Sequence, residues 1–242
     1  MKDIVFISDL HLMPERPQTM KLFSRFVDQI AADADALYIL GDFLEVWWGD
    51  DDPATSYTDV FTSLTSLSQT HNTQVYLMHG NRDFMIGNVL AERCNFEIIT
   101  DPHKIEIQEK SALLMHGDTL CTDDIEYQKF RQMVRSEEWQ QQFLRKTLEE
   151  RFQIARSIRE QSQQSTKQKD EYIMDVNQDE TDKAFLDNDT RLIIHGHTHR
   201  PAIHHKIVNN IDTTRIVLGD WHDTGSYLRI CDSSDYKLQT FS

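Results

Sequence analysis

The chain has few of the residues that mark secreted, membrane-spanning or nucleic-acid-binding proteins. Its three cysteines, Cys94, Cys121 and Cys231, are widely spaced and form no CxxC pair, which is typical of free thiols in a reducing compartment. No apolar run approaches the ~20 residues that a membrane-spanning helix needs, and nothing before the first run, at 4–7, resembles a signal peptide. We therefore expect a cytoplasmic protein.

Positive charge is also scarce. There are 25 Lys and Arg residues against 40 Asp and Glu, a formal net charge of −15. Such a surface repels the phosphate backbone of nucleic acids, which disfavours a nuclease and predicts no nucleic-acid partner. The 242 residues are enough for one large α/β domain over residues 1–242, with room for an inserted subdomain.

Five short apolar runs each lead into a small turn that carries possible metal ligands. The runs and their polar residues are 4–7 with Asp9 and His11, 37–40 with Asp42, 75–78 with Asn81, 113–115 with His116, and 192–194 with His197 and His199. Continuous apolar runs are typical of buried parallel strands, and α/β sheets place their chemistry at the carboxyl ends of such strands. The pattern predicts that the seven polar side chains meet in one site.

Helical periodicity fills the intervals between the first runs. Residues 19–32 place Phe23, Phe26, Val27 and Ile30 on one face, and 57–68 is a second candidate helix. Near the end of the chain, 172–185 is a further candidate helix. The alternating residues of 203–208, 215–218 and 226–230 predict antiparallel strands.

The composition changes between 124 and 170. This stretch has no Gly or Pro, and its apolar residues recur at helical spacing, which predicts two or more helices. It holds 10 Lys and Arg against 8 Asp and Glu, whereas the remainder of the chain holds 15 against 32. That contrast favours an inserted helical cap with a partner of its own. The simpler interpretation is a helical hairpin with a solvated charged face.

The chemistry of this residue set is metal-assisted hydrolysis. Two cations about 3.5–4 Å apart lower the pKa of a bound water and neutralise phosphoryl oxygens. Holding two like charges so close requires a bridging anion, for which Asp42 is the candidate. Imidazole and oxygen donors together suit Mn, Fe or Zn rather than Ca. Each motif alone also fits an ordinary turn or helix cap, but the three imidazoles of 195–199 have little structural use.

The motifs in this order, DxH, GD, GN, H and GHxH, resemble the calcineurin-like dinuclear metallophosphoesterases. The resemblance implies a two-sheet sandwich flanked by helices, with an inserted helical lid at 124–170. It implies that one metal is held by Asp9, His11, Asp42 and His199, and the other by Asp42, Asn81, His116 and His197. His195 matches no ligand position and is expected to be a structural neighbour.

One position departs from the family pattern. Many members carry a His directly after GN as a proton donor to the leaving group, and this chain has Arg82 there. A guanidinium cannot act as a general acid, but it can clamp phosphate oxygens. That exchange suits a leaving group that is itself a phosphate, as in a pyrophosphate bond. The alternative is a structural ion pair between Arg82 and Asp83.

Longer stretches narrow the resemblance to one branch of the family, which cleaves UDP-2,3-diacylglucosamine in the lipid A pathway of Gram-negative bacteria. They are 41–51, 80–85, 116–124, 173–177, 195–201 and 218–222. The resemblance implies two Mn²⁺ ions and water attack on the α-phosphate, giving UMP and 2,3-diacylglucosamine 1-phosphate. It also implies a cap that holds the acyl chains and peripheral attachment to the cytoplasmic face of the inner membrane.

The same resemblance implies specific roles for individual residues. Asn81, Arg82 and His116 would be catalytic. The implied substrate contacts are Asn81, Arg82, Asp124, Ser162, Thr166, Lys169 and His197, with Lys167 as an alternative to Lys169.

Two other functions stay open at this stage. A phosphodiesterase for soluble nucleotides could use the same scaffold, although a small soluble substrate does not need an apolar, basic cap. A binding module could retain the fold without catalysis, although a pure scaffold has no need for a cluster of seven ligands with buried charge.

Overall fold

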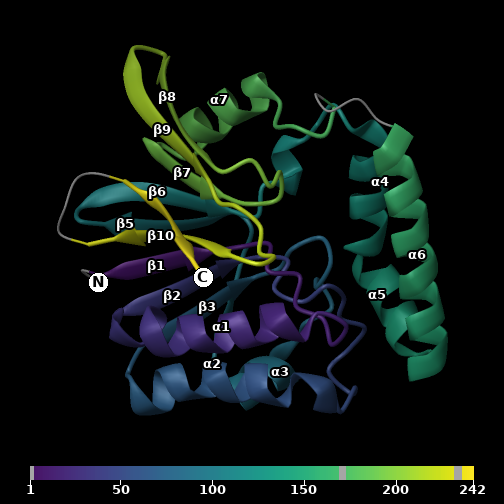
Figure 1. Ribbon diagram of the computed structural model, residues 1–242. Helices are drawn as coiled ribbons and strands as arrows, with labels where there is room; N and C mark the ends of the chain where they lie inside the picture. The colour runs from purple at the N-terminus through teal and green to yellow at the C-terminus, as the bar shows by residue number, and fades with distance from the viewer. Residues whose placement is uncertain (1–2, 169–172, 232–235) are drawn as a thin grey trace.

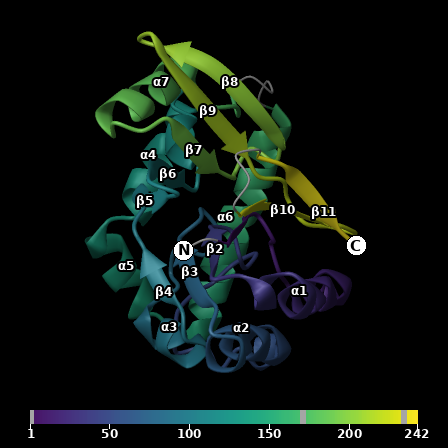
Figure 2. The ribbon, with the colours of Figure 1, turned by 90° about the vertical axis from the view of Figure 1, so that its left-hand side faces the viewer.

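A computed structural model describes residues 3–168, 173–231 and 236–242, and for 163–168 it describes the backbone only. Two β-sheets stack face to face with helices outside them (Figures 1 and 2). The first sheet has the order β11-β10-β1-β2-β3-β4 and the second β5-β6-β7-β9-β8. The strands are β1 (Ile4–Ile7), β2 (Ala36–Leu40), β3 (Gln74–Met78), β4 (Glu97–Ile99), β5 (His103–Ile107), β6 (Lys110–Met115), β7 (Leu192–His195), β8 (Ala202–Val208), β9 (Ile211–Val217), β10 (Gly225–Ile230) and β11 (Leu238–Phe241).

The centre of each sheet is parallel. β1 to β4 run parallel in the first sheet, and β6, β7 and β9 in the second. The antiparallel partners are β10 and β11 on one side and β5 and β8 at the two edges of the other. The five apolar runs expected as strands are β1, β2, β3, β6 and β7, so the predicted α/β two-sheet class is confirmed.

Alternation along the strands divides the apolar residues among three layers. Phe6 and Tyr38 face the second sheet, and Tyr38 stacks between Phe6 and Tyr76 at ring distances of 5.3 and 4.6 Å. Val5 and Ile7 point the other way, into a second core under the helices. Both faces of the parallel strands are therefore buried, which is why the runs lack polar residues.

Helices α1 (Pro17–Gln29), α2 (Thr58–Thr70) and α3 (Asn88–Cys94) cover the outer face of the first sheet (Figure 1). The first two confirm the predicted helices. α7 (Gln178–Asp187) covers the outer face of the second sheet. The expectation of a helix over 172–185 was wrong at its start, because the Asn177 side chain accepts hydrogen bonds from the amides of Asp179 and Glu180 and begins the helix there.

Between Ile125 and Gln168 the chain forms the helices α4 (Ile125–Val134), α5 (Glu137–Leu144) and α6 (Leu148–Gln168). We call these three helices the insertion. It stands beside the sandwich rather than on either sheet (Figure 1). The prediction of two or more helices here is confirmed. Among the described residues, no helix combines the length and apolarity needed to cross a bilayer.

Four arginines of the insertion bind acceptors on the sandwich. They are Arg131 with Asp118 at 2.7 Å, Arg135 with the Gly80 carbonyl at 2.8 Å, Arg151 with the Trp48 carbonyl at 2.8 Å and with Asp51, and Arg159 with Glu45 at 2.8 Å. The excess of basic residues in the insertion therefore attaches it to an acidic sandwich.

The packing of α1 gives a test of the fold. Phe26 is fully buried, and its ring meets Trp221 edge-on at 5.1 Å and Tyr227 at 5.3 Å. We expect Phe26→Ala to lower the free energy of unfolding by about 3–5 kcal/mol, because the cavity cannot close fully. Chemical denaturation measures this, and Val89→Ala on the exposed face of α3 is the control. A loss no larger than that of the control would contradict the assigned packing.

Candidate metal centre

The predicted ligands lie on loops at the carboxyl ends of the strands, and most of them have left-handed backbone. The φ angles are 54° at Asp9, 47° at His11, 51° at Asp42, 69° at His197 and 55° at His199. L-residues rarely adopt this region, and Asp, Asn and His tolerate it best. The ligand loops therefore turn sharply directly after each strand, and the side chains face one another.

Backbone hydrogen bonds connect these loops to one another. The amide of Asp9 donates to the Gly41 carbonyl at 3.1 Å, and the amide of His11 donates to the Asp42 carbonyl at 2.9 Å. The amide of Gly196 donates to the His116 carbonyl at 2.8 Å, which links the two ligand loops of the second sheet in the same way. Each ligand loop is thus held in position by backbone hydrogen bonds to a neighbouring ligand loop.

The glycines between the ligands allow this close approach. A Cβ atom at Gly80 would lie 2.1 Å from both the amide nitrogen and Oδ1 of Asp42. At Gly196 it would lie 2.2 Å from Oδ2 of Asp9. Gly80 of the GN motif and Gly196 of the GHxH motif are therefore required, because a side chain at either position would collide with a ligand carboxylate.

The first cluster contains Asp9, His11, Asp42 and His199. Nε2 of His199 lies 3.2 Å from Oδ1 of Asp9 and 3.3 Å from Nε2 of His11. Nε2 of His11 lies 3.7 Å from Oδ2 of Asp42. Ligand atoms of Asp9, His11 and His199 all lie within 4.8 Å of one another, close enough to bind one cation.

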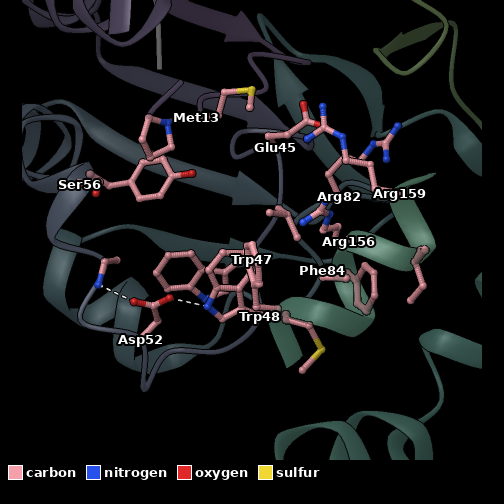
Figure 3. A pocket seen from close by; sticks show the side chains of 18 of the residues that line it. Met13, Glu45, Trp47, Trp48, Asp52, Ser56, Arg82, Phe84, Arg156 and Arg159 are labelled. Carbon is pink, nitrogen blue, oxygen red and sulfur yellow. Dashed lines mark hydrogen bonds and ion pairs between the residues drawn. The ribbon is translucent and has the colours of Figure 1, made fainter. Parts of the chain in front are cut away.

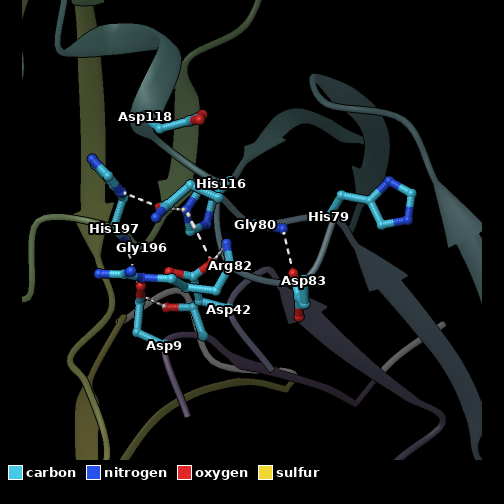
Figure 4. A network of polar contacts seen from close by, with 12 residues as sticks. Asp9, Asp42, His79, Gly80, Arg82, Asp83, His116, Asp118, Gly196 and His197 are labelled. Carbon is cyan, nitrogen blue, oxygen red and sulfur yellow. Dashed lines mark hydrogen bonds and ion pairs between the residues drawn. The ribbon is translucent and has the colours of Figure 1, made fainter. Parts of the chain in front are cut away.

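The second cluster contains His116, His197 and the other oxygen of Asp42 (Figure 4), together with Asn81. Oδ1 of Asn81 lies 3.0 Å from both Nε2 of His116 and Nδ1 of His197. Oδ1 of Asp42 lies 3.9 Å from Nε2 of His116. Asp42 thus turns one carboxylate oxygen to each cluster, and the structure brings all seven predicted ligands together.

The electrostatics of this arrangement favour bound positive charge. Burial raises the pKa of Asp9, but the histidines around it, His199 first, lower it below its usual range. Burial lowers the pKa of His116, but Asp42, Asp118 and Asp9 raise it to about 9. Oδ1 of Asp9 is buried and makes no hydrogen bond within the described chain. A divalent cation would satisfy these groups, and the mixed N and O donors suit a transition metal.

A second set of residues holds the ligand imidazoles from behind. Nδ1 of His116 lies 2.9 Å from the Leu40 carbonyl, and Nδ1 of His199 lies 3.3 Å from Asp220. Such outer contacts orient the ring of a metal-binding histidine. The sequence did not predict this role for Asp220, and the available signal was its place in 218–222, one of the stretches that carry the family resemblance.

Asp118 lies behind the second cluster, and its role was not predicted from the sequence. This buried carboxylate accepts hydrogen bonds from the Tyr127 hydroxyl at 2.6 Å and from Arg131 at 2.7 Å. The Tyr127 ring lies over His197 with centroids 5.9 Å apart. The position of Asp118 two residues after His116 was the available signal.

The residues after Asn81 have separate roles. Asp83 is buried and accepts hydrogen bonds from the amides of Phe43 at 2.8 Å and Gly80 at 2.9 Å, so its partners are backbone groups of the ligand loops. The backbone amide of Arg82 donates to Oδ1 of Asp42 at 2.8 Å. The Arg82 guanidinium instead lines a cavity, which favours the phosphate-clamp interpretation over the pair with Asp83.

His195 lies outside both clusters. Its buried Nε2 is 3.0 Å from Arg215, and burial together with that charge lowers its pKa to about 3. The expectation that it is a structural neighbour agrees with this position.

A cavity of about 390 Å³ opens beside the ligands, between the sandwich and the insertion (Figure 3). Asn81 and Arg82 line it near the ligands. Charged side chains such as Glu45, Asp52 and Arg156 also line it, and eight of its lining residues are aromatic, namely Trp47, Trp48, Tyr57, Phe84, Phe130, Trp139, Phe143 and Phe152. It can hold an apolar group next to the metal centre.

The remaining predicted contacts lie at or in the insertion. Asp124 accepts a hydrogen bond from the amide of Tyr127 at 3.1 Å and caps α4. Ser162 is half-buried on α6, and Thr166 lies on the part of α6 whose side chains are not described. Lys169 lies outside the described residues.

Residues 2–201 match the calcineurin-like phosphoesterase family, and the chain belongs to that family. Its fold is similar to that of a solved archaeal phosphodiesterase, with a TM-score of 0.52, 14% identity and 99% of each chain covered.

Curated relatives are much more similar in sequence. A Stenotrophomonas maltophilia protein named UDP-2,3-diacylglucosamine hydrolase is 44% identical over 245 residues, covering 98% of each chain. Proteins of the same name from Hahella chejuensis and Yersinia pseudotuberculosis are each 43% identical, covering 97% and 98% of this chain and 95% and 98% of their own lengths.

The two-sided position of Asp42 predicts an effect on both clusters. We expect Asp42→Ala to lower bound metal at both together, whereas His199→Ala, which faces only the first cluster, should spare the second. Metal content after dialysis, measured by mass spectrometry, checks this in folded protein. Equal loss in the two variants would contradict a shared role for Asp42.

Proposed function

We propose that this chain hydrolyses the pyrophosphate bond of UDP-2,3-diacylglucosamine in lipid A biosynthesis. Water attacks the α-phosphate, and the products are UMP and 2,3-diacylglucosamine 1-phosphate (lipid X). The relatives' shared name and their coverage of nearly the whole chain support this substrate. The observation that carries the proposal is the aromatic cavity beginning at Asn81 and Arg82, because it places an apolar binding space against a phosphate-cleaving centre.

The metal centre would hold two Mn²⁺ ions. Asp9, His11, Asp42 and His199 would bind one, and Asp42, Asn81, His116 and His197 the other. When bound, the pair supplies an activated water and charge neutralisation at the phosphoryl oxygens. The carboxylate of Asp42 would bridge the pair, and its separate contacts to His11 and His116 support this role.

Arg82 stabilises phosphate charge in the transition state. Its backbone amide holds Asp42, while its side chain faces the cavity with a buried Nε that has no hydrogen bond in the described structure. A free guanidinium donor at this place can bind a phosphate oxygen through a charge-assisted hydrogen bond. Asn81 and His116 would complete the catalytic set as ligands of the second metal, beside Arg82.

The insertion acts as a cap on a single domain of residues 1–242, and 124–170 is its extent. Its aromatic inner side would hold the acyl chains, and Asp124, Ser162, Thr166 and Lys169 would contact the sugar lipid. Several apolar side chains of the insertion are exposed, namely Ile125, Met133 and Leu144. Such residues support peripheral attachment to the cytoplasmic face of the inner membrane.

The first test is product formation by metal-stripped protein in detergent. We expect UMP to form from UDP-2,3-diacylglucosamine only after Mn²⁺ is restored. The protein carrying Asp42→Ala is the matched control. If a simple aryl phosphodiester is cleaved and no UMP appears, the soluble-nucleotide phosphodiesterase is the better assignment. If neither is cleaved by metal-loaded protein, the fold serves binding rather than catalysis.

Arg82 gives a second test. We expect Arg82→Ala to lower kcat by roughly 100- to 1,000-fold, the usual cost of losing one donor to a developing phosphate charge. Metal content should stay the same, because the contact from residue 82 to Asp42 is made by the backbone. Arg82→Lys should recover part of the rate. An unchanged kcat in the alanine variant would make Arg82 structural.

A further inference from the structure

Glu45 lies between the metal centre and the insertion. It follows Asp42 by three residues, and its side chain is buried although it carries charge. Its backbone amide donates to the Leu12 carbonyl at 3.0 Å, next to the bridge between Leu12 and Leu44. The backbone under Glu45 is thus fixed to the loop that carries His11.

One carboxylate oxygen of Glu45 contacts His11, a ligand of the first cluster, from its outer side. Oε2 lies 3.2 Å from Nδ1 of His11, the ring nitrogen that points away from the cluster. Nε2 of the same ring faces Asp42 and His199. A carboxylate on the outer nitrogen keeps the proton there and directs the lone pair of the other nitrogen toward the metal.

The other oxygen of Glu45 binds the insertion. Oε1 lies 2.8 Å from Nη1 of Arg159 on α6. Both residues line the cavity, and Figure 3 shows their side chains close together beside Arg82. One buried carboxylate therefore joins a metal ligand to the helix that covers the proposed substrate.

We propose that Glu45 is a positioning residue that couples the seating of α6 to the geometry of the first metal site. Arg159 holds the carboxylate in place, and the carboxylate holds the His11 ring. Loss of Arg159 leaves Glu45 free to turn toward solvent, so His11 is less well oriented and the first metal is bound more weakly. The proposal concerns the regulation of the site to which the proposed function assigns two metals.

Titration of metal-free protein with Mn²⁺, followed by the EPR signal of free Mn²⁺ without substrate, tests this coupling. We expect Glu45→Ala to weaken the first site by about 10- to 100-fold, the usual effect of losing an outer partner of a ligand. Arg159→Ala should weaken it by a smaller factor. Glu45→Gln keeps an acceptor for His11 and should recover part of the affinity.

Arg156→Ala is the matched control. Arg156 lies on the same helix and pairs with Glu160 of that helix at 3.0 Å, so its loss does not remove a contact between α6 and the ligand loops. We expect it to leave Mn²⁺ affinity unchanged. Circular dichroism checks that each variant is folded, and if Glu45→Ala is not, the Gln and Arg159 variants carry the test.

The double variant Glu45→Ala with Arg159→Ala separates coupling from independent effects. If Arg159 acts through Glu45, the double variant binds Mn²⁺ no more weakly than Glu45→Ala alone. Multiplied losses, or wild-type affinity in Glu45→Ala, would overturn the proposal. Because no substrate is present, wild-type protein that binds Mn²⁺ but forms no UMP would refute the proposed function and leave this result standing.

Discussion

The whole site depends on one electrostatic constraint, the gathering of buried carboxylates and imidazoles within ion-pair distance of one another. Asp9 and Asp42 are almost fully buried, and four ligand histidines surround them. Such crowding is costly unless positive charge compensates it. The carboxylates around His116 raise its pKa to about 9, so a proton on this ring offsets part of their charge, and a divalent cation at the ligands would do the same.

Several residues that carry the ligands have strained backbone conformations in this arrangement. Left-handed residues, bracing hydrogen bonds between loops and two sterically required glycines all act at the carboxyl ends of the strands. Strained backbone persists only where its surroundings determine it fully. Here the surroundings are the parallel strands at the centre of each sheet. Both faces of these strands are buried, which fixes their register and therefore the positions of their ends.

The insertion extends the same electrostatics. Part of its basic excess serves attachment, because Arg131, Arg135, Arg151 and Arg159 bind acceptors on the sandwich. Arg82, which belongs to the sandwich, lines the cavity beside Asn81, and Arg156 and Arg159 of α6 line it as well. Glu45 connects Arg159 to the ligand loop of His11.

The sequence by itself determined the parallel strands, the helical insertion and the seven candidate ligands. Each of these depends on local pattern: continuous apolar runs, helical spacing, and ligand types next to small turns. Which residues support the ligands depends on the tertiary structure. Glu45, Asp118 and Asp220 lie in stretches that carry the family resemblance, but the group that each acid contacts is set when loops distant in the chain meet. The N-cap at Asn177 likewise ended a periodicity that the pattern alone extended too far. These features depend on contacts between residues that are far apart in the sequence, and the spacing of residues along the chain does not reveal such contacts.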